Sequence, residues 1–177
     1  MAVIILIGYR GVGKSTIASE IVKTLSKEHE ITKISLDEKL ADKIGNLQAF
    51  IKANGWDAFR DEETLLLKNL ELSNQFYVID CGGGIVEREE NISLLKKLGK
   101  IFYIKAGVET IQKRLMTTHA RLSLSGKESF FDEIKNVLER RNPLYIKSAD
   151  FIIESDSLSI DECVKAIIEK YKTKRGS

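Results

Sequence analysis

Short apolar runs rich in branched residues alternate along this chain with longer segments of helical period. Five of these runs are almost continuously apolar, as expected for strands that are covered on both faces. They span residues 3–7, 31–36, 76–79, 101–104 and 151–153. This alternation is typical of an α/β domain, and it predicts a five-stranded parallel sheet flanked by helices.

The segments between these runs carry apolar residues at the three- and four-residue spacing of a single helix face. The clearest stripe begins after Ser159, a residue type that caps the first turn of a helix. Its members are Ile160, Val164, Ile167, Ile168 and Tyr171. Shorter stripes at residues 108–115 and 131–138 predict two further helices.

Two stretches lack this periodicity. Residues 117–129 are rich in Thr, Ser and Gly, so little apolar area holds them in place, and we expect a mobile lid there. Residues 172–177 are expected to be a frayed tail. A single domain is therefore expected over residues 1–171, with its substrate-binding helices at about residues 37–70.

Length, charge and cysteine content limit the functions that are open to the chain. Its 177 residues are enough for one core, and its net charge of +2 is too small for a nucleic-acid-binding surface. The apolar run at residues 2–7 is too short for a signal sequence or a membrane span. Cys81 and Cys163 lack metal-ligand spacing, which fits a reducing compartment. We expect a cytoplasmic monomer that binds neither nucleic acid nor membranes.

The first predicted strand is followed directly by a phosphate-binding pattern, G-x-x-x-x-G-K-[ST], at Gly8, Gly13, Lys14 and Ser15. In such a loop the lysine supplies a charge to the β and γ phosphates, and the hydroxyl ligates Mg²⁺. The alternative is a glycine-rich turn without a ligand, but the strand before it and the helix after it favour nucleotide binding. The predicted ATP-binding residues of this segment are Gly11, Val12, Gly13, Lys14, Ser15 and Thr16.

Three later segments follow or flank predicted strands, where α/β proteins bind their ligands. They are Ser35-Leu36-Asp37, residues 54–60 with Glu63, and residues 81–87 with the sequence CGGGIVE. Together with Arg121 and the segment RNPLY at 141–145, they make the chain resemble the shikimate kinase family over essentially its whole length. The sequences of the second and third segments are especially similar to the shikimate kinase domain of the fungal pentafunctional AROM polypeptide.

This resemblance implies a P-loop kinase of the nucleoside monophosphate kinase type that uses ATP and Mg²⁺ to phosphorylate the 3-hydroxyl of shikimate. Arg60 and Arg141 would bind the carboxylate of the substrate with a two-pronged geometry that lysine does not offer. Asp37 would orient the attacking hydroxyl and take its proton. Backbone groups would approach the substrate closely at Gly82, Gly83 and Gly84.

The resemblance also implies that Arg121 closes over the nucleotide and that Arg114 stacks on adenine. Glu63 is predicted to hold Arg60 in place. Structural alternatives exist for several of these residues, because Asp37 could simply cap the following helix and each arginine could be a solvated surface charge. The catalytic residues predicted from the combined pattern are Lys14, Asp37 and Arg121.

The chain departs from the family pattern at the expected metal site. The family carries Asp-x-Asp after the second strand, whereas this chain has Ser35-Leu36-Asp37, and a serine supports the water shell of Mg²⁺ less well than a carboxylate. The third strand instead ends in Asp80, like the aspartate that supports Mg²⁺ in other P-loop enzymes. We hypothesise that Ser15 and Asp80 serve the metal, the alternative being a strand-end aspartate that bonds local backbone.

The sequence leaves two other functions open. A related kinase could act on another carboxylated polyol, such as quinate or gluconate. Because Ser35 weakens the expected metal site, a kinase-like binding or regulatory protein is a second alternative, although Lys14 and Asp37 are retained. Among residues without a predicted chemical role, we expect Trp56 and Phe59 to lie in the core.

Overall fold

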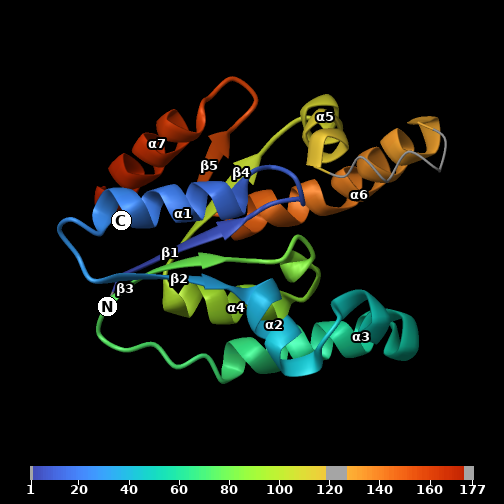
Figure 1. Cartoon of the computed structure of the whole chain (residues 1–177), viewed down its shortest axis with the longest axis horizontal. Coiled ribbons are helices and arrows are strands. Elements are labelled where there is room, and N and C mark those ends of the chain that lie inside the picture. The colour runs from blue at the N-terminus through green and yellow to red at the C-terminus, as the bar shows by residue number, and fades with distance from the viewer. Residues whose placement is uncertain (1, 119–126, 174–177) are drawn as a thin grey trace.

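Parallel strands form the centre of the fold (Figure 1). The computed structural model describes residues 2–118 and 127–173. The sheet has the order β2-β3-β1-β4-β5, and each neighbouring pair of strands is parallel. The strands are β1 (Ala2–Ile7), β2 (Ile31–Ser35), β3 (Phe76–Asp80), β4 (Lys100–Lys105) and β5 (Phe151–Glu154). The predicted five-stranded parallel sheet is therefore confirmed.

Helices cover both faces of this sheet (Figure 1). They are α1 (Lys14–Leu25), α2 (Leu36–Ile44), α3 (Leu47–Lys68), the 3-10 helix η1 (Ile85–Glu87), α4 (Glu89–Leu98), α5 (Val108–Thr118), α6 (Lys127–Ser148) and α7 (Ile160–Lys172). The predicted cap of the last helix is confirmed. The Ser159 side chain accepts a hydrogen bond from the Glu162 amide, and the Glu162 carboxylate accepts one from the Ser159 amide.

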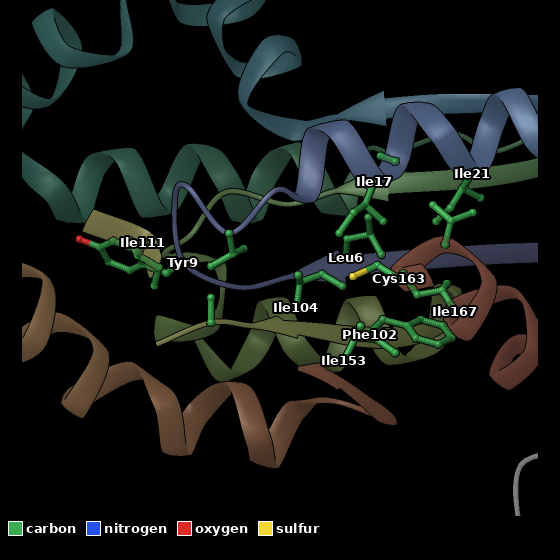
Figure 2. Packing of buried hydrophobic residues seen from close by; sticks show 14 of the residues in the cluster. Leu6, Tyr9, Ile17, Ile21, Phe102, Ile104, Ile111, Ile153, Cys163 and Ile167 are labelled. Carbon is green, nitrogen blue, oxygen red and sulfur yellow. The ribbon is translucent and has the colours of Figure 1, made fainter. Parts of the chain in front are cut away.

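The alternation of side chains along β1 divides the apolar interior into two cores. Ile4 and Leu6 face the core beneath α1 and α7, where Ile17 of α1 and Cys163 of α7 point toward the sheet (Figure 2). Val3, Ile5 and Ile7 face the opposite core, which α3 and α4 cover. Each Ile or Leu that is fully buried in this way stabilises the fold by about 1.5–3 kcal/mol. The almost continuous apolar run of β1 is thus explained by burial on both faces.

The second strand ends one residue earlier than predicted. Its last residue, Ser35, turns its hydroxyl to the backbone amide of Glu38 at 3.3 Å and so caps α2. Leu36 then begins the helix, and its buried side chain belongs to the core on the α3 and α4 face. The apolar character of Leu36 therefore reflects burial at the start of a helix and not a further strand position.

Helix α3 is kinked at Gly55, whose backbone angles of φ 85° and ψ 170° are not helical. Only a residue without a Cβ adopts such a conformation readily. The kink starts a new helical piece that carries Trp56, Phe59 and Arg60. Phe59 is buried as predicted, but the prediction for Trp56 was wrong, because this residue is 58% exposed. Cys81 and Cys163 are buried.

The strand order brings two loops and the start of a helix to one edge of the sheet. β1 lies between β3 and β4. The connection from β1 to β2 and the connection from β3 to β4 therefore run in opposite directions along the sheet, and such a switch point is where α/β sheets bind ligands. The loops after β1 and β3 and the start of α2 after β2 all lie at this carboxyl edge (Figure 1). Among the described residues, no helix is long and apolar enough to cross a membrane.

Candidate active site

The loop after β1 has the backbone of a phosphate cradle. Gly13 adopts a left-handed conformation with φ 99° and stands at the N-terminus of α1 without a side-chain cap. The first turn of α1, which contains Ser15 and Thr16, therefore presents its positive end at the loop. An anion placed there would meet backbone N–H groups. The predicted strand, loop and helix arrangement is confirmed.

Lys14 is folded back onto this loop and is buried. Its ammonium donates hydrogen bonds to the carbonyl oxygens of Gly8 at 3.0 Å and Tyr9 at 3.1 Å. Burial lowers the pKa of Lys14, although the carboxylates of Asp80 and Asp37 oppose that shift. The charge of Lys14 is thus held at the cradle, between the loop backbone and two carboxylates.

Ser15 and Asp80 meet at the centre of the site. The Ser15 hydroxyl donates to Asp80 Oδ2 at 2.5 Å, and the buried Asp80 Oδ1 has no hydrogen-bond partner among the described residues. Buried carboxylate oxygens are normally satisfied, so this atom has capacity for a water or an ion. Asp80 is also the register partner of Ser35 in the pairing of β2 with β3. Asp80 therefore lies on the strand next to Ser35, the position at which the family pattern has an aspartate.

This pair fits Mg²⁺ better than an ion that needs many protein ligands. No cluster of three or more His, Cys, Asp or Glu side chains suited to a metal occurs within residues 2–118 and 127–173. Mg²⁺ in phosphoryl-transfer sites is typically held by one or two protein groups together with phosphate oxygens and water. A serine hydroxyl beside a buried carboxylate with an open oxygen supplies such groups.

The glycine triplet after β3 packs tightly against the residues predicted to bind the substrate. A Cβ on Gly82 would lie 2.6 Å from Asp37 Oδ1 and 3.2 Å from Glu63 Oε1. A Cβ on Gly84 would lie 1.9 Å from Arg60 Nη2, well inside van der Waals contact. Larger residues would therefore displace Asp37 and Arg60, which explains why the loop consists of glycines.

Asp37 is the second residue of α2 and is open to solvent on one side. The suggested role as a helix cap was wrong, because Ser35 caps this helix. Partial desolvation in the site raises the pKa of Asp37, and the neighbouring charge of Lys14 counteracts part of this effect. A carboxylate with a raised pKa near a bound phosphate is suited to accept a proton from a hydroxyl group.

Arg60 is buried among carboxylates and aromatic rings. Its Nη1 donates to Glu63, as predicted, and its Nη2 donates to Glu87 at 2.9 Å. Its guanidinium carbon lies 5.1 Å from the centre of the Trp56 ring and 5.4 Å from that of Phe59. The contact with Glu87 was not predicted, although Glu87 is the last residue of the motif CGGGIVE, three residues after the glycine triplet.

Arg141 reaches the same place from α6. Its Nε donates to Glu87 at 3.1 Å, and its Nη1 donates to the Gly83 carbonyl at 3.4 Å. The buried Tyr145, also from α6, donates its hydroxyl to the same carbonyl. The structure therefore brings Arg60 and Arg141 together, although they are 81 positions apart in the sequence.

Arg114 from α5 fastens the nucleotide loop to the segment after β5. It donates to the carbonyl oxygens of Val12 at 2.9 Å and Ser155 at 3.0 Å. The contact of Arg114 with adenine stays a prediction. Arg121 and most of the expected lid lie outside the described residues.

Comparisons with known proteins point to one enzyme family. The family profile described as "Shikimate kinase" matches residues 10–172. The shikimate kinase of Leptospira biflexa is 33% identical over 178 residues, which covers 94% of this chain and 93% of the relative. The pentafunctional AROM polypeptide of Komagataella phaffii is 35% identical over 154 residues, or 86% of this chain and 10% of the polypeptide. The structure of a shikimate kinase from Acinetobacter baumannii in complex with shikimate superimposes with a TM-score of 0.81, at 26% identity, over 98% of this chain and 96% of that chain.

Proposed function

This chain belongs to the shikimate kinase family and is a phosphotransferase, and we propose that it moves the γ-phosphoryl group of Mg²⁺·ATP to the 3-hydroxyl of shikimate. One observation carries the assignment of the two substrates to one site. The glycine triplet touches the backbone of the nucleotide loop at Gly83, while Gly82 and Gly84 touch Asp37 and Arg60. Donor and acceptor sites are therefore adjacent, as an in-line transfer requires.

On the donor side, we assign the phosphates of ATP to the loop at residues 8–15. The backbone N–H groups of Gly11, Val12 and Gly13 and the first turn of α1 would bind phosphate oxygens. The ammonium of Lys14 would exchange its two carbonyl partners for the β and γ phosphates and so neutralise charge that develops on the transferring group. Arg121 is proposed to add a second positive charge from the lid.

For the metal, we assign the Ser15 hydroxyl as a direct ligand and Asp80 as the carboxylate that supports it. The ion, when bound, neutralises negative charge on the phosphates. Asp80 would orient the hydroxyl through the hydrogen bond at 2.5 Å, and its free Oδ1 would accept a hydrogen bond from a metal-bound water. Ser35 is already engaged as a helix cap, which supports the exchange of roles between Ser35 and Asp80.

On the acceptor side, we assign Arg60 and Arg141 to the carboxylate of shikimate and Asp37 to its hydroxyl groups. Asp37 would accept the proton of the attacking hydroxyl, and its raised pKa brings its basicity closer to that task. Holding the carboxylate at one end and a hydroxyl at the other fixes the direction of attack. Gly82 and Gly84 let Asp37 and Arg60 lie directly against the backbone of this loop, where a Cβ would displace them.

The test is a coupled assay of ADP release with shikimate, quinate and gluconate as acceptors. Turnover that depends on shikimate, with much lower kcat/KM for the other two, is expected. A chain that binds ATP but turns over none of the three acceptors would instead be a regulatory protein. Faster turnover of quinate or gluconate would assign the same site to a different carboxylated polyol.

A further inference from the structure

Glu87 lies at the centre of an arginine cluster that the proposed mechanism does not use. It is the last residue of η1, three residues after Gly84. Its Oε2 accepts from Arg60 at 2.9 Å, and its Oε1 accepts from Arg141 at 3.1 Å and from Arg140 at 2.6 Å. Partial burial disfavours the ionised form of Glu87, but the hydrogen bond and charge of Arg141 and the charges of Arg60 and Arg140 outweigh this and lower its pKa.

Glu87 therefore bonds to both of the arginines that the proposed function assigns to the substrate carboxylate. In this arrangement, the two charges of Arg60 and Arg141 are balanced by the two charges of Glu63 and Glu87. Arg140, the third arginine that pairs with Glu87, is 65% exposed, so water screens its charge. Among the four more buried groups, a third carboxylate would therefore leave a net negative charge. Because like charges repel strongly where water is excluded, one carboxylate has to leave when an anionic substrate enters.

Burial indicates which carboxylate leaves. The Glu63 side chain is 2% exposed and lies behind Arg60, whereas the Glu87 side chain is 24% exposed. The third partner of Glu87 lies toward the surface, since Arg140 is 65% exposed while Arg60 and Arg141 are 7% and 13% exposed. Moving from the buried arginines to Arg140 would keep Glu87 paired and would free two guanidinium groups.

We propose that Glu87 occupies the place of the substrate carboxylate in the empty site and that a carboxylated substrate displaces it toward Arg140. This inference rests on the proposed function, because it assumes that Arg60 and Arg141 bind the substrate. Glu87 is thus a specificity-determining residue. It keeps the buried arginines neutralised without substrate, and only a ligand with its own carboxylate restores the charge balance after Glu87 has moved.

The experiment measures shikimate binding directly through Trp56. This residue is the only tryptophan of the chain, and its exposed ring lies 5.1 Å from the Arg60 guanidinium, so its fluorescence should respond to occupation of the site. Glu87→Gln keeps the size and a hydrogen-bond acceptor but removes the competing charge. We expect the variant to bind shikimate about tenfold more tightly than the wild type, with unchanged affinity for ATP.

Three comparisons distinguish displacement from a purely structural role. The methyl ester of shikimate, which lacks the charge, should gain much less affinity from Glu87→Gln than shikimate does. Arg140→Ala should weaken shikimate binding about fivefold in the wild type, because the displaced Glu87 loses its partner, but less than twofold in the Glu87→Gln background. The matched control is Glu89→Gln, which removes an exposed ion pair with Lys147 at 3.3 Å and should leave the affinity for shikimate unchanged.

Equal or weaker shikimate binding by a folded Glu87→Gln variant would overturn the inference, because it would mean that Glu87 only positions the arginines. Thermal unfolding shows whether Glu87→Gln folds. If it does not, the effect of Arg140→Ala on shikimate binding by the otherwise wild-type protein decides between displacement and a structural role. The same gain for shikimate and its ester would also overturn displacement. If the wild type neither binds nor phosphorylates shikimate, the proposed function itself is wrong. If the wild type phosphorylates shikimate but Glu87→Gln gains no affinity for it, only the role of Glu87 is refuted.

Discussion

The role assigned to Asp80 makes the most specific prediction. Asp80→Asn keeps the shape of the side chain and a hydrogen-bond partner for Ser15 but removes the negative charge next to the proposed ion. If Asp80 supports Mg²⁺, this variant should bind the metal–nucleotide complex more weakly while its affinity for nucleotide without metal stays similar. The fold should survive, because the amide still fills the buried position at the end of β3.

The geometry gives the size of the effect. A Ser15 hydroxyl bound to Mg²⁺ would lie about 2.1 Å from the ion, and Asp80 Oδ2 is 2.5 Å from that hydroxyl oxygen. The carboxylate would therefore be about 4 Å from the divalent charge, an attraction of about 2 kcal/mol in the dielectric of water and about 8 kcal/mol at an effective dielectric constant of about 20. Because desolvation offsets part of the larger value, we expect the lower one, which is about a 30-fold loss of affinity.

The assay titrates Mn²⁺, as a paramagnetic substitute for Mg²⁺, into enzyme with ADP and follows the free ion by electron paramagnetic resonance. This readout does not depend on turnover. Ser35 is the register partner of Asp80 on β2, so the double variant Ser35→Asp/Asp80→Asn returns a carboxylate to the neighbouring strand. We expect it to recover most of the lost metal affinity.

Ser35→Ala provides the control for the second position. It removes the cap of α2 and should lower stability by about 1 kcal/mol without changing metal affinity. Metal binding by Asp80→Asn that equals the wild type would refute the reasoning, as would a double variant no better than Asp80→Asn. In either case Asp80 would be a structural partner of Ser15 only.

Three further predictions concern the acceptor site and the stability of the fold. Asp37→Asn should lower kcat by a factor of about 10²–10⁴ with little effect on ATP binding. In the wild type, kcat/KM should fall as the pH decreases through the raised pKa of Asp37, which lies above the ordinary value of about 3.9. An acidic limb of the pH profile at or below that value would contradict the role of Asp37 as a base. Gly84→Ala should abolish measurable shikimate binding but not ATP binding, because its methyl group would lie 1.9 Å from Arg60 Nη2. Calorimetric titration of each ligand checks this prediction, and normal shikimate affinity would show that binding does not require Arg60 in its present position. Ser159→Ala should lower the free energy of unfolding by about 1 kcal/mol through loss of the capping box, measured by urea denaturation, with kcat unchanged.

The sequence predicted contacts within one helical turn and, through resemblance to known enzymes, the grouping of Ser15 with Asp80 and of Arg60 with Arg141, but not the contacts of Glu87. The motif Arg60 to Glu63 spans one helical turn, so its ion pair follows from helix geometry. The pairing of Glu87 with Arg60, Arg140 and Arg141 joins residues 27, 53 and 54 positions apart, and no local pattern encodes it. Trp56 was misplaced because an apolar residue type does not require burial, and here the exposed tryptophan lies next to the buried Arg60.

The sequence by itself determined the α/β architecture, the strands, the phosphate loop and the cap of α7, because each depends on spacing between neighbouring residues and on burial of one or both faces of an element. Only the tertiary structure decided how the groups of the site contact one another. The insertion of β3 between β2 and β1 sets Asp80 beside Ser35 and close to Ser15, and the packing of α6 against η1 brings Arg141 to Glu87. These distances follow from strand order and helix packing, which are set by the burial of the whole chain and not by any segment alone.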